Sequence, residues 1–258
     1  MTHFKVVIPA RYAATRLPGK PLRMLAGKPM IQHVFERAME SGADEVLIAT
    51  DDERIRDAAG QFGAKVCMTS PQHRSGTERL SEVVSRQDYT ADSIVVNLQG
   101  DEPLLPPALI RQVADDLAAH PDASIATLCA PLTQAAHLFD PNVVKLVMDQ
   151  AGFALYFSRA PIPWDRERFG STPPQLGAHP DYFRHIGLYA YRCGFLHEYV
   201  DRPPCRVEQL ESLEQLRALW YGYRIHVALA VMEPEAGVDT EEDLLRVEAV
   251  LKDKAGDI

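Results

Sequence analysis

Three basic side chains lie close together near the start of the chain. Arg11, Arg16 and Lys20 occupy a loop that begins at Pro9, directly after the apolar, strand-like run Phe4–Ile8. Open α/β sheets bind their ligands at the carboxyl ends of their strands. Clustered cations at such a place favour a polyanion, and a nucleoside triphosphate is the obvious small one. The alternative, a solvated surface cluster, does not account for the rigid Pro-Gly-Lys-Pro sequence of the loop.

The loop lacks the features of two common phosphate-binding sites. A P-loop reads G-x-x-x-x-G-K-[ST], whereas this chain has Ala14 at the first glycine position and Pro21 after the lysine, so no hydroxyl is available there for Mg²⁺. The dinucleotide fingerprint G-x-G-x-x-G is absent as well. Side-chain cations, rather than a nest of backbone amides, are therefore expected to hold the phosphates.

Two acidic residues follow strand-like segments and are candidates for a metal site. Asp101 comes after the apolar run Ile94–Leu98, and Asp239 precedes a helix that already has its own cap in Thr240 and Asp243. Mg²⁺ takes one or two carboxylates and completes its coordination with phosphate oxygens and water. Both acids could converge on one cation. The alternatives are a cap role for Asp101 and a favourable charge near a helix dipole for Asp239.

The sequence Ser-Gly-Thr-Glu-Arg at residues 75–79 is typical of a helix start, with Ser75 or Thr77 as its cap. This segment is read either as an ordinary capped surface helix or as a source of hydroxyls and of the Arg79 guanidinium for a base or a phosphate. The spacing alone does not decide between the two.

Two further polar residues lie on apolar elements. If residues 207–220 form one helix, Glu214 lies about 40° from Leu210, at the edge of an apolar stripe, where a carboxylate either reaches solvent or contacts a ligand. His185 lies on an apolar strand, and a histidine in such a place is more often a hydrogen-bonded core residue than a ligand contact.

Composition limits the choice of partners. The chain has 258 residues and a formal net charge of −9, and its basic residues form no long run, so neither nucleic acid nor an anionic membrane is expected as a partner. The four cysteines are widely spaced and indicate neither a zinc site nor a redox dithiol. No apolar segment approaches the roughly 20 residues needed to span a bilayer. We expect a cytoplasmic protein with a single domain over residues 1–258.

The order of the elements predicts an α/β fold. Strand-like runs alternate with helical patterns in the first half, which implies a parallel sheet with helices on both faces. Gly42 and Gly63 follow two of these helices as C-caps. Residues 124–191 are β-rich, which predicts an inserted antiparallel extension whose exposed strands a second subunit could cover. Helices are predicted again at 207–220 and 241–251.

Taken together, these motifs closely resemble the 3-deoxy-manno-octulosonate cytidylyltransferase family over nearly the whole chain. The matching segments are residues 7–12, 15–22, 75–79, 97–103, 156–159, 162–166, 213–217 and 237–240. The resemblance implies a Rossmann-like nucleotidyltransferase sheet with a β-rich region for dimerisation and sugar binding. It also implies a homodimer that uses Mg²⁺ to transfer CMP from CTP to 3-deoxy-manno-octulosonate (Kdo) for lipopolysaccharide synthesis.

The resemblance also implies roles for individual residues, with the phosphate cations and the metal ligands forming the catalytic group. The implied contacts are Arg11, Arg16 and Lys20 for the triphosphate; Ser75, Arg79 and Gln99 for the cytidine; Asp101 and Asp239 for Mg²⁺; and Arg159, His185, Tyr189, Glu214 and Gln215 for the sugar acid.

Two features depart from the family pattern, and other functions remain open. Ala14 stands where the family commonly has serine, and residues 170–180 form a longer, more Pro-rich stretch. A cytidylyltransferase for another acid sugar is the nearest alternative. A sugar-nucleotide-binding protein without catalysis is another, although a binder would not need both acids. A glycosyltransferase would usually show an Asp-x-Asp motif, which Gly-Asp-Glu at residues 100–102 is not.

Overall fold

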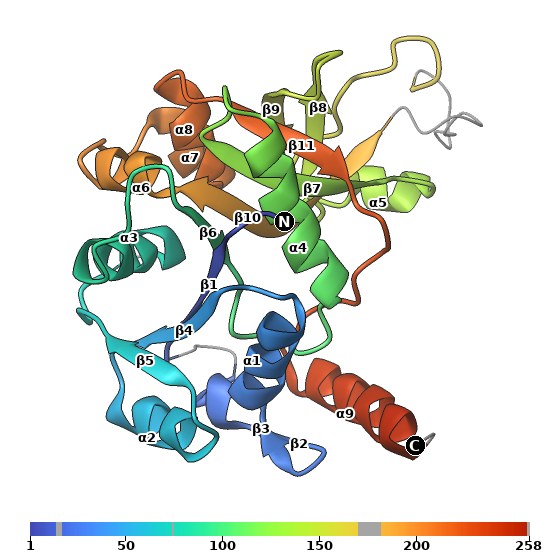
Figure 1. Cartoon of the computed structure of the whole chain (residues 1–258). Coiled ribbons are helices and arrows are strands. Elements are labelled where there is room, and N and C mark those ends of the chain that lie inside the picture. The colour runs from blue at the N-terminus through green and yellow to red at the C-terminus, as the bar shows by residue number, and fades with distance from the viewer. Residues whose placement is uncertain (14–16, 74, 170–181, 257–258) are drawn as a thin grey trace.

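A twisted, mostly parallel sheet forms the centre of the computed structural model, which describes residues 1–13, 17–73, 75–169 and 182–256, with the backbone alone for 254–256. Its strands lie in the order β11-β7-β10-β6-β1-β4-β5, and the β8–β9 pair branches from β10 (Figure 1). The strands are β1 Lys5–Ala10, β4 Glu45–Thr50, β5 Lys65–Met68, β6 Ile94–Asn97, β7 Ile125–Pro131, β8 Lys145–Met148, β9 Ala154–Ser158, β10 Phe183–Arg192 and β11 Ile225–Leu229, with the small pair β2 Met24–Leu25 and β3 Lys28–Pro29 apart from the sheet.

Helices cover both faces of the sheet, as the alternating pattern predicted (Figure 1). One face packs against α1, α2 and α4, and the other against α3, α6 and α8. Val6, Val7 and Ile8 of β1 alternate between the two cores, which is why this part of the strand is a continuous apolar run. The helices are α1 Met30–Glu40, α2 Glu53–Gln61, α3 Gly76–Arg86, α4 Pro107–Ala119, α5 Ala135–Phe139, α6 Cys193–Val200, α7 Arg206–Glu211, α8 Gln215–Trp220 and α9 Glu241–Gly256.

Two strands of the predicted β-rich region, β7 and β10, lie within the main strand order of the sheet. β7, which was predicted as part of an antiparallel extension, pairs in parallel with β11. β10 runs antiparallel between β6 and β7. Only the β8–β9 hairpin branches away. The predicted α/β fold is confirmed: in the order β11-β7-β10-β6-β1-β4-β5, β10 alone runs antiparallel to its neighbours, and the branching β8–β9 pair is antiparallel as well.

Predicted helix ends are confirmed in several places and wrong in one. Gly42 and Gly63 have φ of 75° and 76° after α1 and α2, as their C-cap role requires. The single helix predicted over residues 207–220 is instead α7 and α8, because Ser212 adopts φ 52° and ψ 50° and reverses the chain. Leu210 and Glu214 are therefore not on one helix, and the predicted 40° relation between them is wrong.

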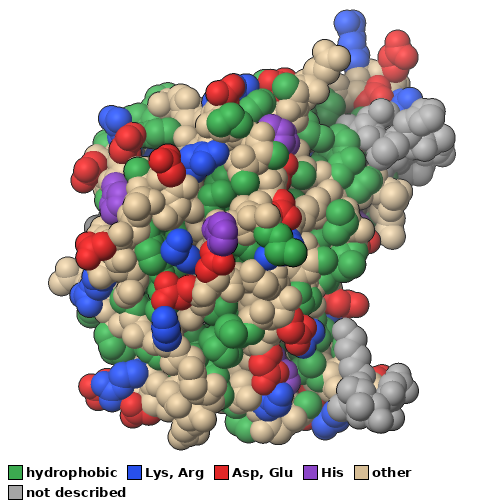
Figure 2. Space-filling view, in the orientation of Figure 1, with side chains coloured by type: hydrophobic (Ala, Val, Ile, Leu, Met, Phe, Trp, Pro, Cys, Tyr) green, Lys and Arg blue, Asp and Glu red, His purple; other side chains and the backbone are tan. Residues whose placement is uncertain are grey.

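The face of the molecule drawn in Figure 2 carries side chains of both charges, and the acidic and basic groups are interspersed there. Among the helices of the described chain, none has the length and apolar character to cross a membrane.

A buried threonine stabilises the irregular point of β10. The pairing of β10 with β7 shifts between Ile186 and Tyr189. Thr127 of β7 is fully buried there, and its Oγ1 lies 3.1 Å from the Ile186 oxygen and 2.8 Å from the Leu188 oxygen. The single hydroxyl hydrogen can serve either carbonyl oxygen at the point where the ladder shifts, and Oγ1 also lies 2.9 Å from His185 Nε2.

We expect Thr127→Val, which keeps the side-chain shape, to lower the free energy of unfolding by about 1–3 kcal/mol, because it removes a buried donor from the carbonyl oxygens and a partner from His185 Nε2. Urea unfolding at pH 7.5 measures the change. The exposed Thr133→Val is the matched control and should stay within about 0.5 kcal/mol of the wild type. Equal stability of Thr127→Val and the control would contradict this role.

Candidate active site

A lysine joins the two acids that the sequence suggested as metal ligands. Lys20 Nζ donates to Asp101 Oδ2 at 2.6 Å and to Asp239 Oδ1 at 3.0 Å. Burial alone would lower the pKa of Lys20, but the two carboxylates raise it above its ordinary value. Lys20 is therefore held as a cation, and three segments far apart in the chain meet at one point.

Glycines bring these segments together. Gly19, with φ of 68°, turns the chain into the short helix Lys20–Leu22. On the other side, Val238 N donates to the Asp101 carbonyl oxygen at 2.9 Å. A Cβ on Gly237 would lie 3.1 Å from that same oxygen. The absence of a side chain at Gly237 therefore lets the segment before α9 reach the end of β6.

A hollow of about 200 Å³, here called the basic hollow, opens beside this cluster. Arg11 follows the end of β1 and donates from Nη2 to the Ser75 carbonyl oxygen at 3.2 Å. Burial, together with the nearby Arg79, lowers the pKa of Arg11. Cations crowded at a cavity wall are relieved by a bound anion. The lining residues are Pro9, Ala10, Arg11, Ala13, Lys20, Pro21, Gly76, Gln99, Gly100 and Asp101.

Gln99 lies where the basic hollow meets two others. The tyrosine hollow, of about 210 Å³, is walled by Tyr189, Glu214 and Gln215, and the histidine hollow, of about 420 Å³, by His185 and neighbouring residues. Gln99 lines all three. The three hollows together form one region at the carboxyl edge of the sheet.

The tyrosine hollow contains polar groups suited to a hydroxylated ligand. Burial raises the pKa of Glu214, while hydrogen bonds from the hydroxyls of Thr77 and Ser75 oppose the rise. Gln215 is only 8% exposed, and its Nε2 has no hydrogen-bond partner among the described residues. A buried amide without a partner is costly, and a ligand oxygen in this hollow would satisfy it.

Two of the residues implied for the sugar acid lie beside this hollow rather than in its wall. His185 lines the histidine hollow, and its ring packs on Tyr189 with 5.2 Å between the ring centroids. Arg159 is absent from the linings of all three hollows. It donates from Nε to the Glu211 carbonyl oxygen at 2.7 Å and from Nη1 to the Pro141 oxygen at 2.9 Å.

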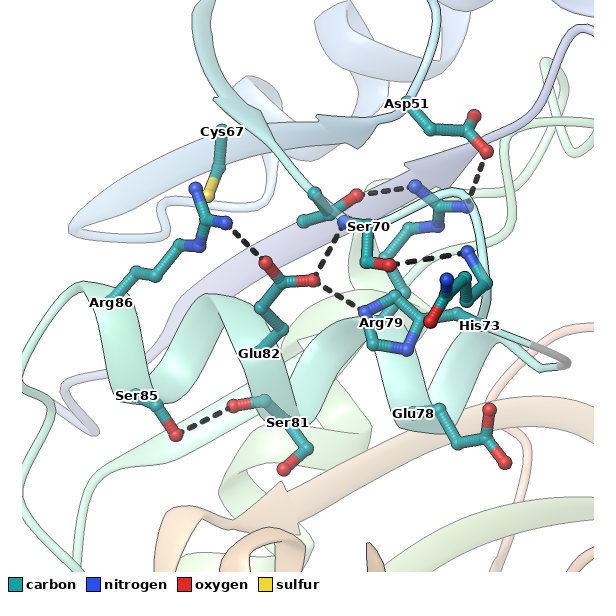
Figure 3. A network of polar contacts seen from close by, with 12 residues as sticks. Asp51, Cys67, Ser70, His73, Glu78, Arg79, Ser81, Glu82, Ser85 and Arg86 are labelled. Carbon is teal, nitrogen blue, oxygen red and sulfur yellow. Dashed lines mark hydrogen bonds and ion pairs between the residues drawn. The ribbon is translucent and has the colours of Figure 1, made fainter.

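Arg79 lies behind the basic hollow, fully buried. Its guanidinium donates to the Thr69 hydroxyl and lies 3.2 Å from the Asp51 carboxylate (Figure 3). Its Nε has no hydrogen-bond partner in the described part of the chain. The sequence did not reveal this burial, because the same helix start is typical of exposed helices.

The loop before α3 is held by a second polar group in the same network (Figure 3). Glu82 accepts from Ser70 N at 2.8 Å, contacts His73, and pairs with Arg86 at 2.5 Å. This group fixes the entry to α3, whose cap Ser75 accepts from Glu78 N at 3.2 Å. Arg16, Ala14 and residues 170–180, which the sequence singled out, lie outside the described residues.

Sequence reasoning did not assign a role to Glu102. Burial, with the neighbouring Asp101 adding to it, raises the pKa of Glu102 to about 7. Its carboxylate would lie 3.0 Å from a Cβ on Gly237. The adjacent acids in Gly-Asp-Glu were the available signal, but the sequence could not show that Asp101 pairs with Lys20 while Glu102 packs beside Gly237.

Another group of potential metal ligands lies at the opposite edge of the sheet. Asp116 and His120 end α4, and His226 begins β11. The two imidazole rings are stacked at 3.4 Å with 15° between their planes. As placed, one ion cannot lie in the planes of both rings, so this cluster is a hydrogen-bonded packing contact.

Comparisons with known proteins show that the chain is similar to cytidylyltransferases. A cytidylyltransferase family model matches residues 5–225. The 3-deoxy-manno-octulosonate cytidylyltransferase of Aeromonas hydrophila is 61% identical over 252 residues, covering 96% of this chain and 98% of the relative. That of Pasteurella multocida is 56% identical over 258 residues, covering 98% and 100%.

Solved structures agree with these relatives. A CMP:2-keto-3-deoxy-manno-octonic acid synthetase complexed with CTP superposes with a TM-score of 0.87 at 42% identity, covering 98% of this chain and 100% of that one. A nucleotidyl transferase from Methanothermobacter, with a TM-score of 0.60 at 16% identity over 98% of this chain and 99% of that one, shares the fold.

His185 makes stability depend on pH. Burial lowers the pKa of His185 to about 3. The unfolded chain protonates this residue below about pH 6.5, whereas the folded protein does not until about pH 3, so stability falls as the pH drops through this window. We expect the wild type to lose up to about 1.4 kcal/mol per pH unit more than His185→Gln below pH 6.5.

Urea unfolding at pH 7.5, 6.5 and 5.5 measures the two slopes. His197→Gln, at an exposed histidine whose Nδ1 lies 3.3 Å from the uncharged Ser85 hydroxyl, serves as the control and should keep the wild-type slope. Parallel slopes for the wild type and His185→Gln would show that the buried imidazole does not stay neutral.

Proposed function

The chain belongs to the cytidylyltransferase family, and we propose that it transfers CMP from CTP to the 2-hydroxyl of Kdo and releases pyrophosphate. CMP-Kdo made in this way is the activated sugar for lipopolysaccharide synthesis. The observation that carries the proposal is the meeting of Lys20, Asp101 and Asp239 beside a cation-lined hollow. It occurs in a chain that matches a CTP-bound structure over almost its full length.

The basic hollow is the proposed place of the triphosphate. Arg11 and Lys20 both line it, and Arg16 belongs to the same loop. Gln99 borders the hollow on the side of the proposed sugar site, and Ser75 caps the helix at its edge. With Arg79 behind them, Ser75 and Gln99 are proposed to surround the cytidine.

Asp101 and Asp239 fit a divalent cation. One oxygen of each already faces a single positive atom, Lys20 Nζ, so the two carboxylates converge on one point. Paired carboxylates beside phosphate oxygens are the ligands that Mg²⁺ uses. When bound there, Mg²⁺ would neutralise phosphate charge and polarise the α-phosphate.

The tyrosine hollow is the proposed place of the sugar acid. Tyr189, Glu214 and Gln215 wall it, and the unpartnered Gln215 amide provides a donor for a sugar oxygen. His185 lies against Tyr189 and would fix the tyrosine ring. Arg159 carries the charge that a sugar carboxylate would pair with.

The reaction follows from this arrangement. The 2-hydroxyl oxygen of Kdo forms a bond to the α-phosphorus of CTP, the bond to the β-phosphate oxygen breaks, and pyrophosphate leaves while the hydroxyl proton passes to solvent or a nearby base. The chain binds both substrates across Gln99, so that attack occurs in line. Lys20 and Arg11 stabilise the charge on the leaving pyrophosphate.

A pyrophosphate-release assay tests the function directly. Purified protein is supplied with each of the four nucleoside triphosphates and with Kdo, an amino-substituted Kdo or a sialic acid, with and without Mg²⁺. Release with CTP and Kdo only supports the proposal, and release with a different acid sugar assigns that sugar instead. Silence across the whole set would support a binding protein without catalysis. Since the reaction consumes CTP, we propose the cytoplasm as its location.

We expect Asp101→Asn and Asp239→Asn each to lower kcat about 100-fold or more, because each removes a carboxylate that faces the reacting phosphates. Both side chains are partly exposed and each variant leaves Lys20 with one carboxylate partner, so the melting temperature should change by only a few degrees. The exposed Asp92→Asn is the matched control, with unchanged kcat. Near-normal turnover by Asp101→Asn at saturating Mg²⁺ would remove it from the catalytic group.

A homodimer is also proposed, formed through the region around β9. Leu155 on β9, Leu210 on α7 and Trp220 on α8 are large, apolar and well exposed, and these elements pack together. β9 pairs only with β8 among the described strands. An exposed edge with apolar side chains is suited to a second copy of the chain.

Light scattering after gel filtration should give twice the chain mass of 28.7 kDa for the wild type. Leu155→Asp should shift the mass to that of the monomer, because it buries a charge in the contact. Leu245→Asp, at an exposed leucine of α9, is the control and should remain dimeric. A monomeric wild type, or a dimer unaffected by Leu155→Asp, would contradict this surface.

A further inference from the structure

Glu211, at the end of α7, contacts Arg159 through both its carboxylate and its carbonyl group. Glu211 Oε1 accepts from the Ser158 hydroxyl at 2.6 Å, and Oε2 accepts from Arg159 N at 2.9 Å. The Glu211 carbonyl oxygen accepts from Arg159 Nε at 2.7 Å. One residue thus holds the end of β9 and the base of the Arg159 guanidinium.

The backbone of Glu211 also sets the course of the next segment. Ser212 follows it in a left-handed conformation, and the chain reverses there before Glu214 and Gln215. Glu211 is the last residue of α7 before Ser212, and its side chain is bonded to the end of β9. The position of Glu211 therefore affects both Arg159 and the segment that carries Glu214 and Gln215.

A buried lysine holds Arg159 from the other side. Lys145 is fully buried, and its Nζ donates to the carbonyl oxygens of Arg159 at 2.6 Å, Val143 at 2.6 Å and Asp140 at 2.8 Å. The Arg159 Nη1 donates to the Pro141 oxygen at 2.9 Å, in the same segment. The backbone N–H and C=O of Arg159 are thus both occupied, and its guanidinium is held separately by the Nε and Nη1 bonds.

We infer that Glu211 is a positioning residue that holds Arg159 at a fixed place relative to Glu214 and Gln215, so that the carboxylate and the hydroxyls of an acid sugar are bound together. The inference rests on the proposed function for the nature of the ligand, and on the contacts of Glu211 for the positioning. Glu211 itself does not line the tyrosine hollow, so it acts through its neighbours.

Acceptor oxygens, rather than the charge of Glu211, do the positioning. A glutamine at this place can accept from Arg159 N through its oxygen and donate to the Ser158 oxygen through its amide. Alanine offers neither of these side-chain contacts and keeps only the backbone carbonyl that accepts from Arg159 Nε. Glu211→Gln should therefore keep the KM for Kdo close to the wild-type value, whereas Glu211→Ala should raise it. A role in packing alone would not predict this difference.

The first test compares Glu211→Ala and Glu211→Gln with the wild type by steady-state kinetics. We expect Glu211→Ala to raise the KM for Kdo about 10-fold while the KM for CTP changes less than about twofold, since the loss is confined to the sugar side. Glu211→Gln should stay within about threefold of the wild type. Glu248→Ala, which removes an exposed glutamate paired with Lys252 on α9, is the control.

Hydrogen exchange of the protein without substrates provides a second readout. In Glu211→Ala the amides of Arg159 and of residues 212–215 should exchange faster, while those of β1 and β6 stay unchanged. Ser158→Ala, which removes one of the two partners of the carboxylate, should give a smaller change in the same residues.

The inference is overturned if Glu211→Ala leaves the KM for Kdo unchanged, raises both KM values equally, or exchanges like the wild type. It is also overturned if Glu211→Gln behaves like alanine. Absence of turnover in the wild type with CTP and Kdo would instead refute the proposed function, and the exchange data would still decide whether Glu211 positions Arg159.

Discussion

The contact of Lys20 with Asp101 and Asp239 is the constraint on which the rest of the site depends. A largely buried ammonium needs its carboxylate partners, because an uncompensated charge at such a place is costly. The turn at Gly19, the end of β6 and the close approach at Gly237 all serve to bring these groups together. Two carboxylates aimed at one cation also define a place where a divalent metal can replace it.

A continuous set of contacts connects this point to the region proposed for the sugar. Arg11 donates to the Ser75 carbonyl, and the Ser75 hydroxyl lowers the pKa of Glu214, opposing the effect of burial. Ser75 is also the cap of α3, so the Glu214 carboxylate lies near the positive end of a helix dipole. The nucleotide side and the sugar side are therefore joined by one helix start, and Gln99 faces both.

Much of this arrangement could be predicted from the sequence, for physical reasons. Strand runs that end in cations or acids place those groups at one sheet edge, so the meeting of Lys20 with Asp101 follows from βα order. The break at Ser212 could not be predicted, because a non-glycine residue with positive φ leaves no pattern in the apolar spacing. The burial of Arg79 depends on Asp51 and Thr69, which directly follow β4 and β5. Long-range partners of this kind are settled by packing rather than by local sequence.

The most direct test of the account is an anomalous difference map from crystals grown with CTP and Mn²⁺. We expect a metal peak within coordination distance of both Asp101 and Asp239, with Lys20 Nζ moved from between them onto a phosphate oxygen of the bound nucleotide. A metal peak elsewhere, or a bound nucleotide with Lys20 still bridging the two carboxylates, would contradict the account.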